Sequence, residues 1–339
     1  MTISICIIGS GFGMYGLLPA FSNIRNCNVV SICGKNSQRM EQYCKKFQVK
    51  RYDDWKEMIQ KEKPNAIAIA VIPIYQYEIV KFALENNIAV FAEKPLSTKY
   101  ETSLELYELA KEKKLPNMVD FIFPEILEWY EAKNIIEDNE FGPITNVDVN
   151  WSFLSHDLKN NLTSWKTDVK KGGGGLSYFF SHGLYYLEFF LGKIEYIQCI
   201  NSSYENKQNS DVELNMKIVF KNGCLGNIHL DISDETNQIH EIKFHSKTKN
   251  LLILKNITNN YADNFELILN GLSKKTKENS PETNNTFKEF EDPRIKLVSN
   301  IAKRFIDWCI TGKKSKPDFY DGLRVQELIK IIRKMSESN

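Results

Sequence analysis

The chain has 339 residues, which at about 150 residues per domain predicts two domains. Hydrophobic residues make up 42% and charged residues 26%, a globular composition that excludes disordered, collagen-like and disulfide-scaffold proteins. The 44 basic and 43 acidic residues nearly cancel, so the basic excess of a dedicated nucleic-acid-binding protein is absent. The seven cysteines are scattered and form no C-x-x-C pair, which predicts reduced thiols and no metal site. The apolar runs are too short to span a membrane, so we expect a cytoplasmic protein.

The first 121 residues alternate strand and helix patterns. The run Ile3–Ile8 is continuously apolar and ends at a glycine, as expected for a strand covered on both faces. Further strands are predicted at 29–33, 66–72, 89–92 and 117–121, and helices at 17–24, 37–47, 53–61, 75–85 and 98–112. Because helices separate the strands, right-handed crossovers should build a doubly wound parallel sheet, a Rossmann domain, over residues 1–121.

Residues 122–339 have a different pattern and predict an α+β domain with a large, mostly antiparallel open sheet. Strands are expected at 145–153, 194–204, 212–220, 224–231, 239–245, 250–254 and 265–269, with helices at 176–191, 295–310 and 320–335. The last helix is expected to pack back on the N-terminal domain. The polar segment 274–285 predicts a solvated surface loop, with a substrate-gating loop as the alternative.

The segment from Gly9 to Gly16 reads G-S-G-F-G-M-Y-G and lies between the first strand and a helix. This context is typical of dinucleotide binding, because a pyrophosphate must approach backbone N–H groups and a helix N-terminus where a Cβ would obstruct it. Gly11, Gly13 and Gly16 form a literal G-x-G-x-x-G, but Gly9 directly follows the strand, so we prefer the frame that starts there. The predicted contacts are Gly9, Gly11, Phe12, Gly13 and Met14; a glycine turn that binds nothing is the alternative.

The end of the second strand bears on the choice of cofactor. An NAD-binding protein usually has an acidic residue there, which bonds the ribose 2′-OH. This sequence has Gly34, followed by Lys35 and Arg39, and no acidic residue before Glu41. Both cations suit a 2′-phosphate. The pattern favours NADP(H), with NAD(H) still possible; the alternative is that these are ordinary surface residues.

The tripeptide Glu93-Lys94-Pro95 directly follows the predicted strand at 89–92. It therefore lies at the carboxyl end of a parallel strand, where α/β sheets bind ligands. A lysine there can contact the nicotinamide ribose or a substrate hydroxyl. Ile72 and Pro73, at the end of another strand, are also predicted to contact the cofactor, as are Glu93 and Lys94.

Taken with the glycine turn, this motif makes the sequence resemble the glucose–fructose oxidoreductase / inositol dehydrogenase (Gfo/Idh/MocA) family over nearly the whole chain. The motifs that carry the resemblance are Gly9-Ser10-Gly11, Leu18-Pro19-Ala20, 68–73, 92–96, 141–144, Trp165, 173–176 leading to Ser181-His182, and 319–327. The resemblance implies hydride transfer between a nicotinamide cofactor and a carbohydrate, nucleotide sugar or related hydroxyl or carbonyl compound. It also implies dimers or tetramers that pack through the open sheet.

Under this resemblance Lys94 matches the family's active-site lysine and His182 its active-site histidine, the latter as general acid/base. The family's usual Asp, four residues before the histidine, is Tyr178 here, one helical turn away on the same face. Tyr178 either contributes a hydroxyl or packs as an aromatic core residue. Trp165 either stacks on a sugar ring or lies in the core. Tyr185 and Ile122 also stand where many members carry Asp and Arg.

These departures leave other functions open. One is an NADP(H)-binding module that has lost catalysis and serves as a sensor or assembly subunit. Another is a reductase of a non-sugar substrate, such as an imine or a tetrapyrrole. In each case the expected partners are a small molecule and further copies of the chain, with no nucleic acid and no membrane.

Overall fold

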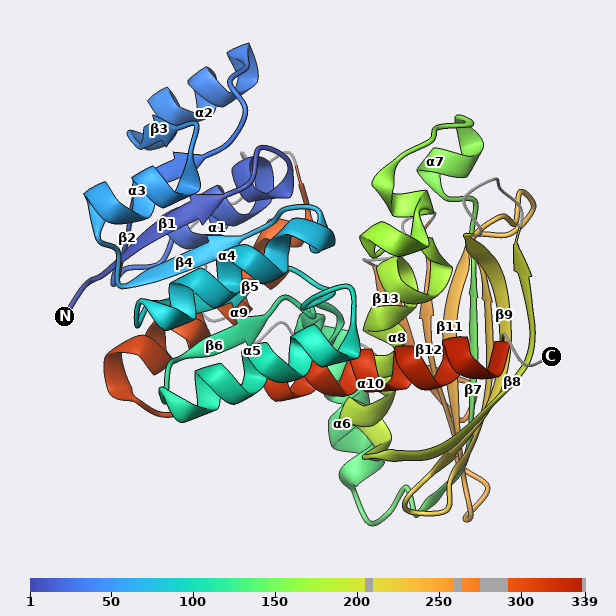
Figure 1. The fold of residues 1–339 in the computed structure, drawn as a ribbon. Helices are drawn as coiled ribbons and strands as arrows, with labels where there is room; N and C mark the ends of the chain where they lie inside the picture. Colours follow the sequence, from blue (N-terminus) through green and yellow to red (C-terminus); the bar gives the residue numbers. More distant parts are fainter. Residues whose placement is uncertain (205–209, 259–263, 275–291, 337–339) are drawn as a thin grey trace. The chain divides into compact units, whose positions relative to one another are not determined.

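A computed structural model describes residues 1–204, 210–258, 264–274 and 292–336 (Figure 1). The chain divides into an N-terminal unit, residues 1–122 and 282–326, and a C-terminal unit, residues 123–281 and 327–339. Each unit contains one sheet, and each is described by itself.

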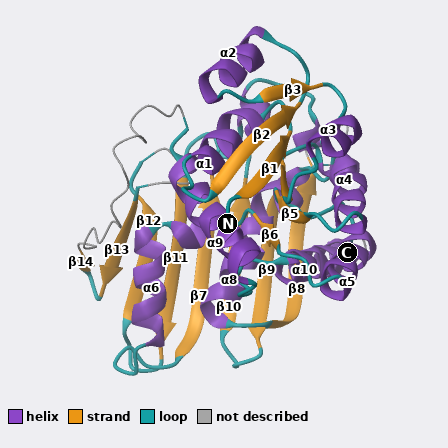
Figure 2. Ribbon diagram, turned by 90° about the vertical axis from the view of Figure 1, so that its left-hand side faces the viewer, coloured by secondary structure: helices purple, strands orange, loops and turns teal. Residues whose placement is uncertain are grey.

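The N-terminal unit is built on a six-stranded sheet in the order β3-β2-β1-β4-β5-β6, in which all neighbours run parallel (Figure 2). Its strands are β1 (Ile3–Ile8), β2 (Cys27–Cys33), β3 (Lys50–Tyr52), β4 (Ala66–Ile69), β5 (Ala89–Ala92) and β6 (Asn117–Val119). The strand order reverses between β1 and β4, where doubly wound sheets bind ligands. All residues of β4 and β5 are buried, as their continuous apolar runs predict.

Side-chain caps start two of the helices of this unit, α2 and α3. The helices that alternate with its strands are α1 (Leu18–Ser22), α2 (Gln38–Phe47), α3 (Trp55–Glu62), α4 (Pro73–Glu85) and α5 (Tyr100–Glu112). The predicted N-cap Ser37 accepts a hydrogen bond from the Met40 N–H at 3.1 Å, and Asp54 caps α3 in the same way. Pro73 occupies the first position of α4, where its missing N–H costs nothing.

Two helices from the end of the chain complete the packing of the N-terminal unit. Helix α9 (Arg294–Thr311) places Phe305 against the rings of Phe21 and Phe91, 6.4 and 5.8 Å away. Helix α10 (Phe319–Ser336) begins where the Phe319 N–H donates to Asn117 Oδ1 at 2.8 Å. Its residues up to Gln326 belong to this unit and its remaining residues to the other.

The C-terminal unit contains an eight-stranded sheet in the order β14-β13-β12-β11-β7-β10-β9-β8, antiparallel except for the pair β7 and β10. Its strands are β7 (Ile144–Ser152), β8 (Ile194–Tyr204), β9 (Asp211–Phe220), β10 (Leu225–Asp231), β11 (Ile239–Ser246), β12 (Leu251–Asn256), β13 (Phe265–Leu269) and β14 (Leu272–Lys274). Burial alternates along β11, so one face of the sheet is covered. Helices α6 (Leu127–Glu137) and α8 (Phe180–Leu191) lie on that face (Figure 1). The predicted fold class is confirmed.

Several predicted elements need correction. Residues 13–17 form a π-helix, η1 (Gly13–Leu17), and α1 adds only a short turn before Ser22, so the helix predicted at 17–24 begins earlier and ends sooner. The helix predicted at 176–191 begins with a second π-helix, η5 (Gly175–Phe179). Strand β3, a polar three-residue edge strand, and helix α6 were not predicted.

Four short helices complete the fold: α7 (His156–Lys159) and the 3-10 turns η2 (Phe123–Glu125), η3 (Trp165–Thr167) and η4 (Val169–Lys171). The polar loop predicted at 274–285 lies, from residue 275 on, outside the described residues. None of the helices in the described ranges is long and apolar enough to cross a membrane.

Candidate active site

The glycine turn after β1 is shaped by a close approach of two backbones. Gly9 has φ +136°, in the region that favours glycine, and a Cβ there would lie 2.1 Å from the Ala70 carbonyl oxygen. Ala70 follows β4, and its N–H donates to the Ile8 oxygen at 2.8 Å. The turn after β1 and the loop that leads through Ile72 to Pro73 therefore meet at the carboxyl edge of the sheet.

Gly11, two residues on, faces open space. Apart from its chain neighbours, no heavy atom of the described residues lies within 4 Å of the position a Cβ would take there, and the residue is exposed. The N–H groups of Met14 and Tyr15 both donate to its carbonyl, at 2.9 and 3.2 Å, and so start the helical turn. Space above a glycine at the start of a helix is what a pyrophosphate requires, so these residues fit a dinucleotide.

The end of β2 combines tight packing with nearby cations. A Cβ on Gly34 would lie 3.0 Å from that of Ser10 in the glycine turn, so there is little room for the acidic side chain usual at this position. Lys35 and Arg39 are both exposed. The Arg39 guanidinium lies 5.3 Å from the centre of the Tyr15 ring, a cation–π contact that holds it beside the glycine turn.

Arg51, on the unpredicted strand β3, adds a further cation at this edge. It donates to the Gly34 carbonyl at 3.2 Å. Its charge is offset by Asp53, whose Oδ2 lies 3.0 Å from Arg51 Nη2.

The Glu93-Lys94-Pro95 turn after β5 is held by one buried amide. The side-chain nitrogen of Gln76, in α4, donates to three carbonyls of this turn: those of Glu93, Pro95 and Leu96, at 2.6, 2.9 and 3.1 Å. Gln76 is 1% exposed. The half-buried Lys94 thus projects from a turn whose backbone has little freedom to move.

A carboxyl pair lies beside this turn. Asp120 follows β6 as Glu93 follows β5, and the two side chains hydrogen-bond to each other. Burial raises the pKa of Asp120 well above its ordinary value, and the Glu93 carboxyl raises it further. Burial also raises the pKa of Glu93, while Lys94 opposes that shift.

In the C-terminal unit, a buried carboxylate fixes the glycine-led π-helix η5. Asp211, 3% exposed on β9, accepts a hydrogen bond from the Leu176 N–H. Cβ atoms on Gly174 and Gly175 would lie 2.6 and 2.7 Å from atoms of Asp211, so the glycines are needed for this approach. Burial raises the pKa of Asp211, and the guanidinium of Arg333, 3.7 Å away, opposes the shift.

Arg333, near the end of α10, also donates to Ser177 Oγ at 2.8 Å. A single guanidinium therefore links β9 to the π-helix. Tyr178 lies in the π-helix, where the Phe180 N–H donates to the Gly175 carbonyl five residues back, and His182 lies in the following helix α8. A shared face for these two side chains stays a prediction.

The two residues occupy different surroundings. His182 is 8% exposed, and its ring meets the ring of Phe123 edge-on, with centroids 5.0 Å apart. Tyr178 is half-buried, edge-on to Trp165 at 5.2 Å, with Lys166 Nζ 5.5 Å from the centre of its ring. The structure thus brings the predicted substrate residues Trp165 and Tyr178 together.

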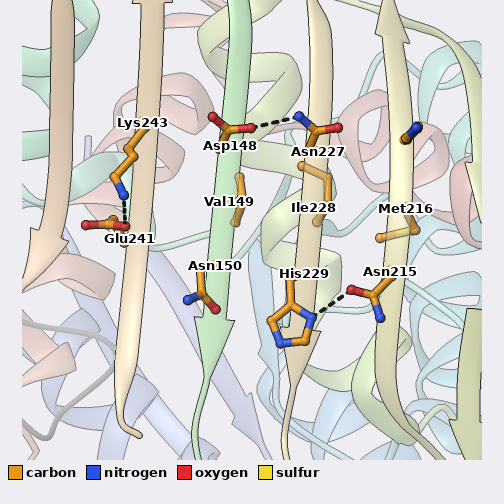
Figure 3. Close-up of a pocket in the computed structure, with 11 residues that line it drawn as sticks. Asp148, Val149, Asn150, Asn215, Met216, Asn227, Ile228, His229, Glu241 and Lys243 are labelled. Carbon is orange, nitrogen blue, oxygen red and sulfur yellow. Dashed lines mark hydrogen bonds and ion pairs between the residues drawn. The ribbon is translucent and has the colours of Figure 1, made fainter. Parts of the chain in front are cut away.

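The uncovered face of the C-terminal sheet carries a hollow of about 330 Å³ (Figure 3). Two pairs of its polar side chains join neighbouring strands, Asn227 with Asp148 and His229 with Asn215, and Lys243 pairs with Glu241 along β11. The side chains shown there come from β7, β9, β10 and β11, and the hollow is lined by Asp148, Val149, Asn150, Asn215, Met216, Lys217, Asn227, Ile228, His229, Glu241 and Lys243.

Comparison with known proteins identifies the family. Residues 3–121 match the Gfo/Idh/MocA oxidoreductase family with its NAD-binding Rossmann fold, and residues 133–339 match the C-terminal alpha/beta domain of the same family. The chain belongs to the Gfo/Idh/MocA oxidoreductases. The resemblance stated from the motifs is therefore confirmed.

An uncharacterised oxidoreductase of Synechocystis is 26% identical over 191 residues, 56% of this chain and 52% of that protein. The chain matches about half, or less, of the length of its curated relatives. Among solved structures, levoglucosan dehydrogenase with NADH shares the fold at a TM-score of 0.84 and 18% identity, covering 100% of this chain and 98% of that one. The WlbA dehydrogenase of Bordetella pertussis, in complex with NADH and UDP-GlcNAcA, gives 0.82 and 15%, covering 99% and 97%.

Four residues of this family member were missed by sequence reasoning: Gln76, Asp120, Asp211 and Arg333. Each acts through a partner more than ten positions away in the chain. The only sequence signal was polarity in apolar surroundings, as for Asp120 between Val119 and Phe121. Such a signal marks a buried polar residue without naming its partner.

Alanine at Gly9 and at Gly11 should have very different effects on the stability of the fold. Gly9→Ala places a Cβ against the Ala70 carbonyl and strains the backbone, so it should destabilise the fold by about 3 kcal/mol or more. Gly11→Ala meets no atom and should change stability by about 0.5 kcal/mol or less. Urea unfolding followed by fluorescence measures both, and equal stabilities would contradict the packing described here.

Removal of the buried carboxylate should loosen the π-helix. Asp211→Ala leaves the buried Leu176 N–H without its acceptor, at a cost of about 1–3 kcal/mol. The matched control is Glu195→Ala, an exposed position on the adjacent strand β8, where the change should be within about 0.5 kcal/mol. If both variants unfold at the same urea concentration, Asp211 does not hold this segment.

Proposed function

We propose that this protein transfers a hydride between a nicotinamide cofactor and a carbohydrate, nucleotide sugar or related hydroxyl or carbonyl compound. The observation that carries the proposal is made at the carboxyl edge of the N-terminal sheet. There the open turn at Gly11 follows β1 and the rigid turn of Lys94 follows β5, with only β4 between these two strands. The N-terminal unit serves as the dinucleotide-binding part and the C-terminal unit as the substrate part.

The residues proposed to hold the dinucleotide lie at the carboxyl ends of four strands. They are Gly9, Gly11, Phe12, Gly13 and Met14 after β1, Gly34, Lys35 and Arg39 after β2, Ile72 and Pro73 after β4, and Glu93 and Lys94 after β5. The nicotinamide supplies hydride acceptance or donation when bound. The protein's part is to bind, to orient and to handle the proton.

Lys94 and His182 are proposed to handle that proton. The Lys94 ammonium donates a hydrogen bond to the substrate oxygen and so favours the charge that develops there. His182 takes or returns the hydroxyl proton, since an imidazole titrates near neutral pH. Its burial against Phe123 limits exchange of that proton with bulk water.

The substrate class is inferred from Trp165, Tyr178 and Lys166. Two aromatic rings at right angles, both half-buried, offer an apolar surface of the kind that packs on a sugar ring. Lys166 beside them supplies a positive charge suited to a phosphate or carboxylate group of the substrate. The UDP-GlcNAcA held by the WlbA dehydrogenase has groups of this kind.

We propose NADP(H) as the preferred cofactor. The tight contact between Gly34 and Ser10 disfavours the acidic side chain that would bond a ribose 2′-OH. Lys35 and Arg39 supply two positive charges at that position. The protein is further proposed to work in the cytoplasm and to self-associate through the uncovered sheet face, where charges of both signs alternate and a second copy finds complementary partners.

A second function is favoured by one observation. Tyr178 stands where the family resemblance leads us to expect a carboxylate, and its ring packs against Trp165 and Phe179. If that packing is its whole role, the protein is an NADP(H)-binding module without catalysis.

Cofactor titration tests the dinucleotide site. The wild-type protein should bind NADPH more tightly than NADH at physiological salt. Lys35→Ala with Arg39→Ala should weaken NADPH binding by about tenfold or more and NADH binding little, because charge-assisted bonds to a phosphate are lost. Lys45→Ala, exposed at the far end of α2, is the control. Gly11→Val should abolish binding of both; tighter NADH binding by the wild type would refute the preference.

Turnover with a panel of sugars and nucleotide sugars tests the chemistry. His182→Ala should lower kcat by about 10²–10⁴-fold, the usual loss of a general acid/base, and leave cofactor affinity nearly intact. A comparable loss in Tyr178→Phe would make the Tyr178 hydroxyl the proton donor, and little change would assign it to packing. Cofactor binding without turnover of any substrate would favour the binding module.

A further inference from the structure

Glu93 and Asp120 are brought together by strand register. Ala92 of β5 is paired with Val119 of β6, and the Asp120 N–H donates to the Ala92 carbonyl at 2.9 Å. Glu93 and Asp120 are therefore the first residues beyond two adjacent parallel strands, and their side chains extend to the same side. The two carboxyl groups are hydrogen-bonded to each other.

A hydrogen bond between two carboxyl groups requires a proton, because a carboxylate only accepts. Asp120 is 2% exposed, and within the described residues its Oδ1 accepts no hydrogen bond. Two negative charges on hydrogen-bonded carboxyls repel each other, which favours a state in which one of the two groups holds a proton. Burial and this repulsion also account for the raised pKa of Asp120.

Two cations face the pair. Lys94 belongs to the same turn, and its backbone N–H donates to Glu93 Oε2 at 3.2 Å. Arg294, at the start of α9, is the other; its own Nη2 lies 2.7 Å from Asp292 Oδ2. Burial raises the pKa values of both carboxyls and the two cations oppose that rise, which favours one negative charge on the pair over none.

We propose that Glu93 and Asp120 share one proton and act together as a single negative charge that keeps Lys94 protonated. Asp120 is then a positioning residue: it acts on the substrate only through Lys94. The consequence for catalysis rests on the proposed function of Lys94, whereas the shared proton does not. A singly charged pair retains its charge when either member becomes an amide, because the remaining carboxylate can accept from the amide N–H.

Infrared spectroscopy tests the shared proton without any substrate. At neutral pH the wild-type protein should show the C=O band of a protonated carboxyl, identified by ¹³C-labelling of aspartate and glutamate. The band should be lost in Asp120→Asn and in Glu93→Gln and retained in Asp53→Asn, an exposed control. Absence of the band from the wild type, or its persistence in Asp120→Asn, would overturn the proposal.

The charge of Lys94 is measured by NMR of ¹³C-methylated lysines, with Lys94→Arg to assign the signal. In the double variant Glu93→Gln/Asp120→Asn the midpoint of the Lys94 titration should fall by at least about one pH unit, because a nearby opposite charge is lost. The single variants should titrate like the wild type, and exposed Lys99 should be unchanged in all of them. An unshifted Lys94 in the double variant would overturn the inference. Both measurements use protein without substrate, so a failure of the proposed enzyme activity leaves their results intact.

Discussion

The close approach of Gly9 to Ala70 is the constraint on which the N-terminal site depends. The two backbones meet because β1 and β4 are adjacent parallel strands of the sheet, and only a residue without a Cβ fits between them. This contact fixes where the chain leaves β1, and hence where Gly11 opens to solvent and where the first helical turn begins. The turn after β5 starts at the same edge, since the Glu93 N–H donates to the Ile69 carbonyl at 2.9 Å.

Buried polar side chains then fix the turns that carry chemistry. The Gln76 side-chain nitrogen donates to three carbonyls of the Lys94 turn, and the Asp211 carboxylate accepts from the N–H of Leu176 in a π-helix. In both places one side chain replaces bonds that regular secondary structure would make, and burial makes the loss of such a bond costly. The turn that carries Lys94 and the π-helix that carries Tyr178 are thereby held in place by buried side chains.

The electrostatics at the carboxyl edge of the N-terminal sheet depend on which carboxyls lie next to the cations. Glu93 adjoins Lys94 in the sequence, but its effect depends on Asp120, which belongs to another strand. In the C-terminal unit, Arg333 likewise offsets the buried charge of Asp211. In both units a buried carboxyl lies within reach of a cation, which lowers the cost of burial and holds the surrounding backbone.

Local sequence patterns were enough to predict the parallel sheet, the sheet of the C-terminal unit, the family and the positions of the glycine and Glu93-Lys94-Pro95 turns. These are encoded locally, in apolar runs, in caps such as Ser37 and in glycines that follow strands. Only the tertiary fold fixes the two π-helices, the contacts of Gln76, the pairing of Glu93 with Asp120 and the ion pair of Asp211 with Arg333. Each of these depends on the register of strands or helices far apart in the chain, and no local pattern records which buried polar groups will meet.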